Sequence, residues 1–163
     1  MLLEALGLKA VPRAGWVRSG VVNPESVAAH SWGVSWLVLA LLPAELDRGR
    51  ALAYAVIHDL PEVRCGDITP ADGLSREAKR KLEHDAAEAL FKDRADLRSL
   101  WESYERQADP EARFVRQLDR LDMALQAAWY RDLQGIDLEE FLDSAASVIS
   151  HPVLVEILQA LRQ

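Results

Sequence analysis

The chain has a single cysteine, Cys65, among its 163 residues. One cysteine excludes an internal disulfide, so a reducing compartment is the better expectation. Basic residues are also scarce, because 19 Lys and Arg stand against 26 Asp and Glu, a formal net charge of −7. That balance argues against a general nucleic-acid binder, which needs a basic face. It does not exclude a small anionic ligand, since a bound divalent cation can dominate the local field.

Long apolar segments are absent as well. The longest one, residues 27–42, contains a histidine, two serines and a glycine, and is too short and too polar to cross a bilayer. The chain starts without a basic stretch ahead of an apolar one, and Glu4 comes early, so no leader is expected. The sequence therefore predicts a cytoplasmic protein that contacts no membrane.

Helical patterns run through the chain, and no segment alternates as a strand would. We expect helices over residues 24–42, 48–60, 75–93, 94–107, 110–133, 137–149 and 152–163, with Asn23 as the cap of the first. The stretch 13–18 is expected to be non-helical, and Trp32 and Trp36, one turn apart, are expected in the core. No repeat, low-complexity tract or long linker divides the chain. The prediction is one all-α helical bundle over 1–163, in which residues 137–163 form the carboxy-terminal helices.

Two metal-ligand side chains, His58 and Asp59, end an almost wholly apolar segment that begins at Ala51. A helix that is apolar all round is buried, and a buried carboxylate is costly unless it is paired or binds a cation. An imidazole beside it favours a metal. The dipeptide alone leaves an equal alternative open, namely a core histidine followed by an aspartate that bonds local backbone.

Other candidate ligands lie far away in the sequence. His30 lies within the helix expected over 24–42. A lone histidine in such an apolar helix is more often a core residue than a metal ligand. The helix expected over 110–133 supplies Asp119 and Asp122, and helical periodicity puts Asp122 nearer the apolar stripe, so periodicity cannot choose the ligand.

A second His-Asp dipeptide, at His84 and Asp85, lies among charged residues and is expected on a solvated helix surface. His151 precedes a proline and is expected at a helix break. Neither histidine is well placed to join a site with His58.

Several short motifs occur in a characteristic order. They read Val-Pro-Arg-x-Gly-Trp-Val at 11–17, Glu-Ser-Val-x-x-His at 25–30, His-Asp-x-x-Glu-x-x-x-Gly-Asp at 58–67 and Gln-x-Asp at 117–119. With these elements the chain resembles the HD-domain superfamily of metal-dependent phosphohydrolases, and within it the 5′-deoxynucleotidase-like branch. The resemblance spans about residues 8–134, and the last 30 residues carry no recognisable motif.

The resemblance implies a helical bundle of the HD-domain type that holds one divalent transition metal per chain. The implied ligands are His30, His58, Asp59 and Asp119. Two imidazoles and two carboxylates make a ligand set of intermediate softness, which suits Mn, Fe, Co, Ni or Zn. The resemblance further implies that Glu62 and Asp67 handle protons and position the attacking water, and a carboxylate is a sensible general base.

Substrate contacts are expected just before the first ligand helix, where Arg13 and Arg18 flank Trp16. Arginine suits phosphate, and a tryptophan face can stack on a base or sugar. The alternative is a surface loop anchored by one buried Trp16. In the bacterial 5′-deoxynucleotidases the tryptophan follows the arginine directly, whereas here it comes three residues later, which leaves discrimination between sugars open.

The expected function is removal of the 5′-phosphate from nucleoside 5′-monophosphates, deoxyribonucleotides above all. One alternative is an HD phosphohydrolase acting on another nucleotide, either a cyclic nucleotide or (p)ppGpp. The other is a non-catalytic, metal-stabilised nucleotide-binding module. A homodimer is implied by the resemblance alone.

Overall fold

The computed structural model describes all 163 residues, and its regular structure is helical apart from one isolated bridge between Pro12 and Ser26. The elements in chain order are α1 (Leu2–Ala5), η1 (Leu6–Ala10), α2 (Ala14–Arg18), α3 (Val27–Leu41), α4 (Arg48–Ile57), α5 (Glu62–Cys65), η2 (Pro70–Asp72), α6 (Arg76–Leu90), α7 (Ala95–Glu105), α8 (Pro110–Gln134), α9 (Glu139–Ala146) and α10 (Pro152–Ala160). The prediction of an all-α fold is confirmed. No helix combines the length and apolar character that a membrane span requires.

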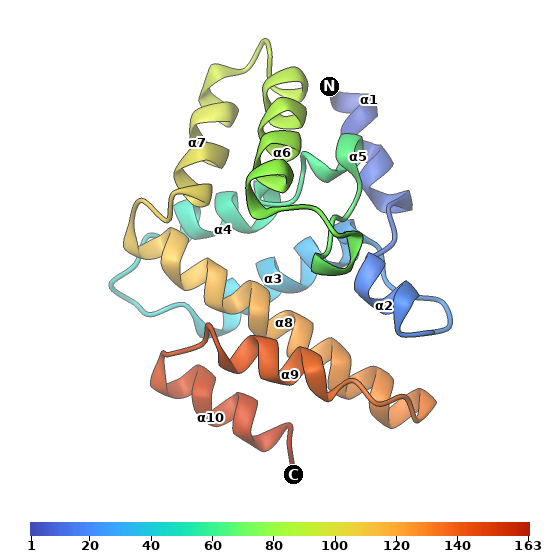
Figure 1. Cartoon of the computed structure of the whole chain (residues 1–163). Coiled ribbons are helices and arrows are strands. Elements are labelled where there is room, and N and C mark those ends of the chain that lie inside the picture. Colours follow the sequence, from blue (N-terminus) through green and yellow to red (C-terminus); the bar gives the residue numbers. More distant parts are fainter.

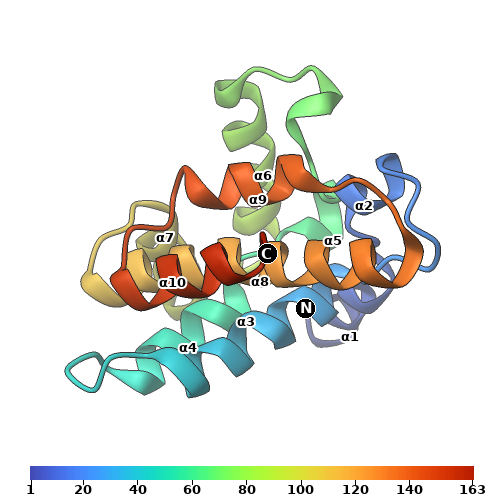
Figure 2. The ribbon, with the colours of Figure 1, turned by 90° about the horizontal axis from the view of Figure 1, so that it is seen from below.

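Helix α8, 25 residues long, runs through the middle of the molecule (Figures 1 and 2). It packs against α3 and α4 on one side and against α9 and α10 on the other, while α7 contacts α4 and α8. The main core gathers where these helices meet, and its fully buried members include Val34, Val38, Leu118, Leu121 and Leu154. This arrangement brings α3, the end of α4 and the middle of α8 together.

Side-chain caps set the starts of the long helices. Asp109 accepts from the Ala112 N–H at 2.8 Å and caps α8, which begins at residue 110 as the sequence predicts. The predicted cap at Asn23 is wrong, because Ser26 caps α3 by accepting from the Ala29 N–H at 3.2 Å. Residues 25–27 are held in an extended pairing with residues 11–13, which prevents an earlier helix start.

Two other differences from the predicted helices affect segments that carry candidate site residues. Residues 14–18 form the short helix α2, which the sequence analysis treated as non-helical. Helix α4 ends at Ile57 instead of continuing to 60, and a tight turn leads into α5. His58 and Asp59 therefore stand at the turn between two helices.

The expectation that Trp32 and Trp36 lie in the core is wrong. Trp32 is 71% exposed and Trp36 is 56% exposed, on the side of α3 that no other helix covers. The opposite side of α3 buries His30, Val34 and Val38. Because α3 is apolar on every side, its sequence does not indicate which side packs against other helices.

Candidate metal centre

The four predicted metal ligands converge from three parts of the fold. His30 comes from α3, His58 and Asp59 from the end of α4, and Asp119 from α8. The Nε2 atom of His30 lies 3.1 Å from Asp119 Oδ1 and 3.7 Å from Asp59 Oδ2. The Nε2 atom of His58 lies 3.2 Å from Asp59 Oδ2. Ligand atoms of His30, His58 and Asp119 all lie within 4.8 Å of one another.

The other nitrogen of each imidazole has its own partner. His58 Nδ1 is 2.9 Å from the Ala55 carbonyl oxygen, to which it must donate. His30 Nδ1 is 2.7 Å from Asp122 Oδ2. In the neutral rings both Nε2 atoms then carry lone pairs, and they face carboxylate oxygens.

That arrangement calls for a positive charge between the lone pairs. The Nε2 atom of His58 is buried without a hydrogen-bond partner, and acceptor atoms that face one another without a donor are costly when buried. Neutral imidazole nitrogens and carboxylate oxygens are ligands of divalent transition metals. The donor set of this structure therefore fits a metal.

Without a metal, protons take over that role. Burial lowers the pKa of His30, but hydrogen bonds to Asp119 and Asp122 outweigh it and raise the pKa to about 9. Burial opposes ionisation of Asp119, yet the contacts with His30 and Arg120 hold the pKa of its carboxyl well below the usual range. The metal-free site thus holds a buried imidazolium among carboxylates.

Glu62 and Asp67 lie around this centre with different surroundings. Glu62 is 7% exposed, and its Oε2 atom is buried with no hydrogen-bond partner. Burial, followed by the charges of Asp59 and Asp67, raises its pKa to about 10. Asp67 follows Gly66, whose φ of 75° allows the turn. The Asp67 Oδ2 atom accepts from the Ala14 N–H at 2.8 Å.

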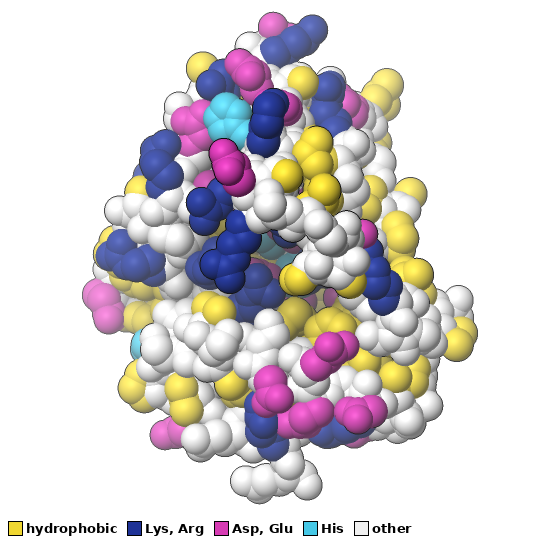
Figure 3. All heavy atoms as spheres, in the orientation of Figure 1, with side chains coloured by type: hydrophobic (Ala, Val, Ile, Leu, Met, Phe, Trp, Pro, Cys, Tyr) yellow, Lys and Arg dark blue, Asp and Glu magenta, His cyan; other side chains and the backbone are white.

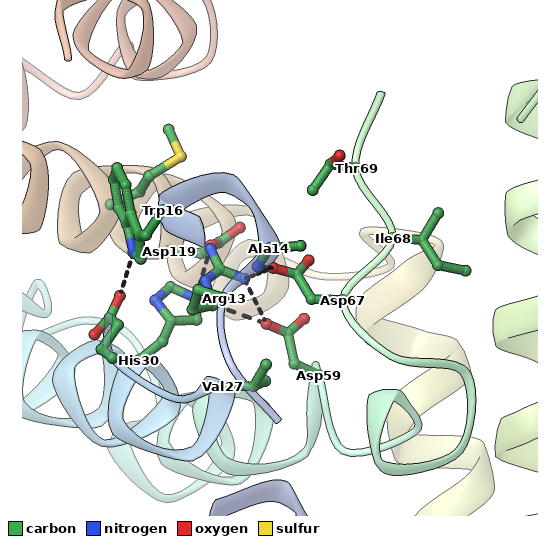
Figure 4. A network of polar contacts seen from close by, with 12 residues as sticks. Arg13, Ala14, Trp16, Val27, His30, Asp59, Asp67, Ile68, Thr69 and Asp119 are labelled. Atoms are coloured by element: carbon green, nitrogen blue, oxygen red, sulfur yellow. Dashed lines mark hydrogen bonds and ion pairs between the residues drawn. The ribbon is translucent and has the colours of Figure 1, made fainter. Parts of the chain in front are cut away.

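Arg13 reaches the same centre from the amino-terminal segment. Its Nη1 atom lies 3.5 Å from Asp59 Oδ2 and 3.9 Å from Asp67 Oδ2 (Figure 4). The guanidinium is thus placed beside a predicted metal ligand, where it can meet an oxyanion.

Trp16 and Arg18 do not join the centre. Trp16 is 1% exposed, packs against Tyr130 and Phe141, and donates from Nε1 to Glu25 Oε1 at 3.0 Å. Its ring has no free face, so the predicted stacking of Trp16 on a substrate does not fit this structure. The alternative reading, a segment anchored by a buried tryptophan, does fit.

Arg18 lies on the surface of α2. It contacts Thr69 and Asp72, and so ties α2 to the segment that contains η2. Its guanidinium is paired there instead of facing the metal ligands.

The second His-Asp dipeptide stands apart, as the sequence analysis expected. The His84 side chain is 52% exposed, and its nearest carboxylate is Glu102 at 4.0 Å. His151 precedes α10 and packs edge-on against Phe114.

Sequence reasoning named Asp122 as a rival of Asp119 for the metal and gave Glu25 no role. In the structure Asp122 contacts His30, and Glu25 lies beside both, with ligand atoms of the three within 4.8 Å of one another. The side chains of Asp119 and Asp122 are equally exposed, at 14%, so burial could not have separated them. Their spacing of one helical turn is the signal that could have placed both beside one histidine.

The space-filling view shows a hollow in the middle of one face, between α6 and α8 (Figure 3). Lys and Arg side chains gather beside it, although the chain as a whole is acidic. Such local positive charge favours the approach of an anion.

Comparisons with known proteins agree on one family. The profile of the HD domain matches residues 6–158. The chain is 40% identical to bovine (Bos taurus) "5′-deoxynucleotidase HDDC2" over 94% of its own length and 78% of that protein. It is 39% identical to the human (Homo sapiens) protein of the same name, over 94% of its length and 79% of that protein. A solved structure of a conserved hypothetical protein from Pyrococcus furiosus superposes with a TM-score of 0.83 at 33% identity, covering 99% of this chain and 96% of that one.

Proposed function

The chain belongs to the HD domain family, and on that premise we propose that it is a metal-dependent phosphohydrolase that removes the 5′-phosphate from nucleoside 5′-monophosphates. The observation that carries this proposal is the pair of buried imidazole Nε2 atoms facing two carboxylates. The names of the relatives support the substrate class, with deoxyribonucleotides as the preferred substrates.

One divalent transition metal per chain is proposed, held by His30, His58, Asp59 and Asp119. Of the metals that suit this donor set, Mn, Fe, Co, Ni and Zn are the candidates. When bound, such an ion supplies Lewis acidity, which offsets the charge that develops on phosphate oxygens and makes water easier to deprotonate.

Glu62 is proposed as the proton acceptor. Its buried Oε2 atom has no hydrogen-bond partner and is free to face a water. In the metal-free protein its carboxyl is protonated at neutral pH, because burial and the charges of Asp59 and Asp67 raise the pKa to about 10. With a cation at Asp59 that repulsion would be offset, and Glu62 would be a carboxylate, the form that can act as a base.

Arg13 and Asp67 are proposed to position the reactants. Asp67 is fixed by the Ala14 N–H and can orient a water by accepting a hydrogen bond from it. Arg13 offers its guanidinium to the phosphate from the side of Asp59. In the reaction the water oxygen bonds to phosphorus while the bond to the 5′ oxygen breaks. The proton of the water passes to Glu62. The leaving alkoxide takes up a proton from solvent water, and Glu62 returns its proton to the solvent.

The decisive experiment measures release of inorganic phosphate from a panel of nucleotides by the chelator-stripped protein, with each divalent metal added in turn. The expected result is metal-dependent release from nucleoside 5′-monophosphates, faster from dAMP than from AMP. If the protein cleaves only a cyclic nucleotide or only (p)ppGpp, it is a phosphohydrolase of a different substrate class. Nucleotide binding without turnover under every metal would identify a binding module.

We further propose a homodimer formed through the uncovered side of α3. Trp32 and Trp36, one helical turn apart on this side of α3, are 71% and 56% exposed. Trp129, two turns beyond Asp122, is 64% exposed. At about 150–250 Å² per aromatic side chain, the three exposed rings present roughly 290–480 Å², more than a third of the ~800 Å² that each partner contributes to a standard interface.

The chemistry of that surface favours a second copy as its partner. Helix α3 contains no Asp, Glu, Lys or Arg from residue 27 to residue 41. Binding to a membrane surface uses basic residues on the polar face of a helix, whereas homodimer interfaces are markedly apolar. A cytoplasmic location is proposed as well, supported by a fold that forms no disulfide.

A further inference from the structure

We propose that Asp122 is a positioning residue that fixes the His30 ring for metal binding, and that Gly33 provides the space in which Asp122 lies. The inference rests on the metal site of the proposed function. It assigns roles to two residues that lie outside the ligand set.

The first observation is the contact between the carboxylate and the ring. Asp122 Oδ2 lies 2.7 Å from His30 Nδ1, and the imidazole is fully buried. A carboxylate accepts hydrogen bonds and has none to donate when ionised, so it selects the form of the ring with a proton on Nδ1. The lone pair of Nε2 is then directed at Asp119 and Asp59, where the metal is proposed.

The second observation is the absence of a side chain at Gly33. A Cβ atom built on this glycine would lie 2.1 Å from Asp122 Oδ1 and 2.9 Å from Asp122 Cγ. Real Cβ atoms do not approach other atoms so closely, so alanine here would displace the carboxylate. Glycine also weakens the interior of a helix relative to alanine. Gly33 is the one glycine of α3, and what it allows is the close approach of Asp122.

The third observation is that the two histidines of the site are oriented by different means. His58 Nδ1 bonds a backbone carbonyl, which no substitution at a side chain removes. His30 depends on a side chain from another helix. Glu25 lies on the same side of the ring, but its Oε1 atom accepts from Trp16 Nε1, and Asp122 is the residue in hydrogen-bond contact with Nδ1.

Removal of the Asp122 carboxylate should therefore weaken metal binding while the four ligands stay present. Loss of an outer-layer partner of a metal-binding histidine typically reduces metal affinity about 10- to 100-fold. Gly33→Ala should have a similar effect, because it displaces the same carboxylate. The two effects share one contact, so they should not add.

The test is calorimetric titration of Co²⁺ into the chelator-stripped full-length protein. We expect Asp122→Ala and Gly33→Ala each to raise the Kd about 10- to 100-fold, and the double variant to bind no more weakly than Asp122→Ala. Asp122→Asn should recover part of the affinity, because its amide oxygen can still accept from Nδ1. Gly49→Ala is the matched control, since its Cβ would meet only Asp47 Oδ1 at 3.3 Å. Thermal unfolding of each metal-free variant tests the fold separately.

Three results would overturn the inference. The first is a Kd for Asp122→Ala within twofold of the wild type. The second is an equal rise in Kd when Gly33→Ala is made in the wild type and in the Asp122→Ala variant, which would indicate general disruption of packing. The third is a wild type with two ions per chain, one of which Asp122→Ala loses entirely, because Asp122 would then be a ligand together with Glu25. A wild type that binds no metal would instead refute the proposed metal site itself, and this inference with it.

Discussion

Removal of the metal should make the stability of the protein fall as the pH rises from 6.5 to 9. In the metal-free site, hydrogen bonds to Asp119 and Asp122 raise the pKa of His30 from 6.5 to about 9. A group whose pKa is higher in the folded protein than in the unfolded chain stabilises the fold by binding a proton. This stabilisation is complete when the pH is below the pKa of the unfolded chain, and it is lost as the pH rises through the pKa of the folded protein.

The size of the effect follows from the same two values. The difference between about 9 and 6.5 corresponds to about 3 kcal/mol, at about 1.4 kcal/mol per pH unit. Glu62 acts in the same direction, because its pKa of about 10 also lies above its ordinary value of 4.5. Since small domains have unfolding free energies of about 5–15 kcal/mol, the loss from His30 alone should be easy to detect.

The assay is urea unfolding of the stripped and the metal-loaded protein at pH 6.5 and pH 9. The stripped protein should unfold at a lower urea concentration at pH 9, whereas the loaded protein should change little, because the cation replaces the protons. His30→Gln should reduce the pH dependence of the stripped protein, and the exposed His84→Gln should not. A stripped wild type that is equally or more stable at pH 9 would refute this account of the site.

Three further predictions concern the ligands, the base and the dimer. His58→Ala should remove the metal in elemental analysis, whereas His84→Ala should retain it; metal loss from the second variant would identify the other His-Asp pair as the site. Glu62→Gln should retain the metal and lose about 100- to 10,000-fold in turnover, and a normal rate would leave Asp67 as the candidate base. Trp36→Glu should convert a dimer to a monomer in light scattering, and a monomeric wild type would exclude the proposed interface.

Most of the fold could be predicted because its signals are local. The 3.6-residue pattern and capping residues such as Asp109 depend only on neighbours in the sequence. The start of α3 was placed too early because the pairing of residues 11–13 with 25–27 is a contact between distant segments. A cap at Asn23 is locally reasonable, but the extended pairing prevails over it.

The convergence of the four candidate ligands could be predicted from motifs, whereas the roles of the residues around them could not. His58 and Asp59 stand out because an apolar helix leads into them. Arg13 and Trp16 are three residues apart, yet the guanidinium meets Asp59 while the indole packs into the core. No property of the two side chains determines which of them faces the site, since both suit a nucleotide. That depends on the direction in which the short helix α2 packs against the rest of the fold.

Tryptophan burial illustrates the same limit more generally. Trp16 was expected at a site and lies in the core, while Trp32 and Trp36 were expected in the core and lie on the surface. Apolar area favours burial of all three, but a helix has more sides than its neighbours can cover. In α3 the side facing α8 is taken up by the His30–Asp122 contact and by Gly33. Small residues and the proposed metal ligand His30 must face inward there, so the bulky rings of α3 are left on the outside, where only another molecule can cover them.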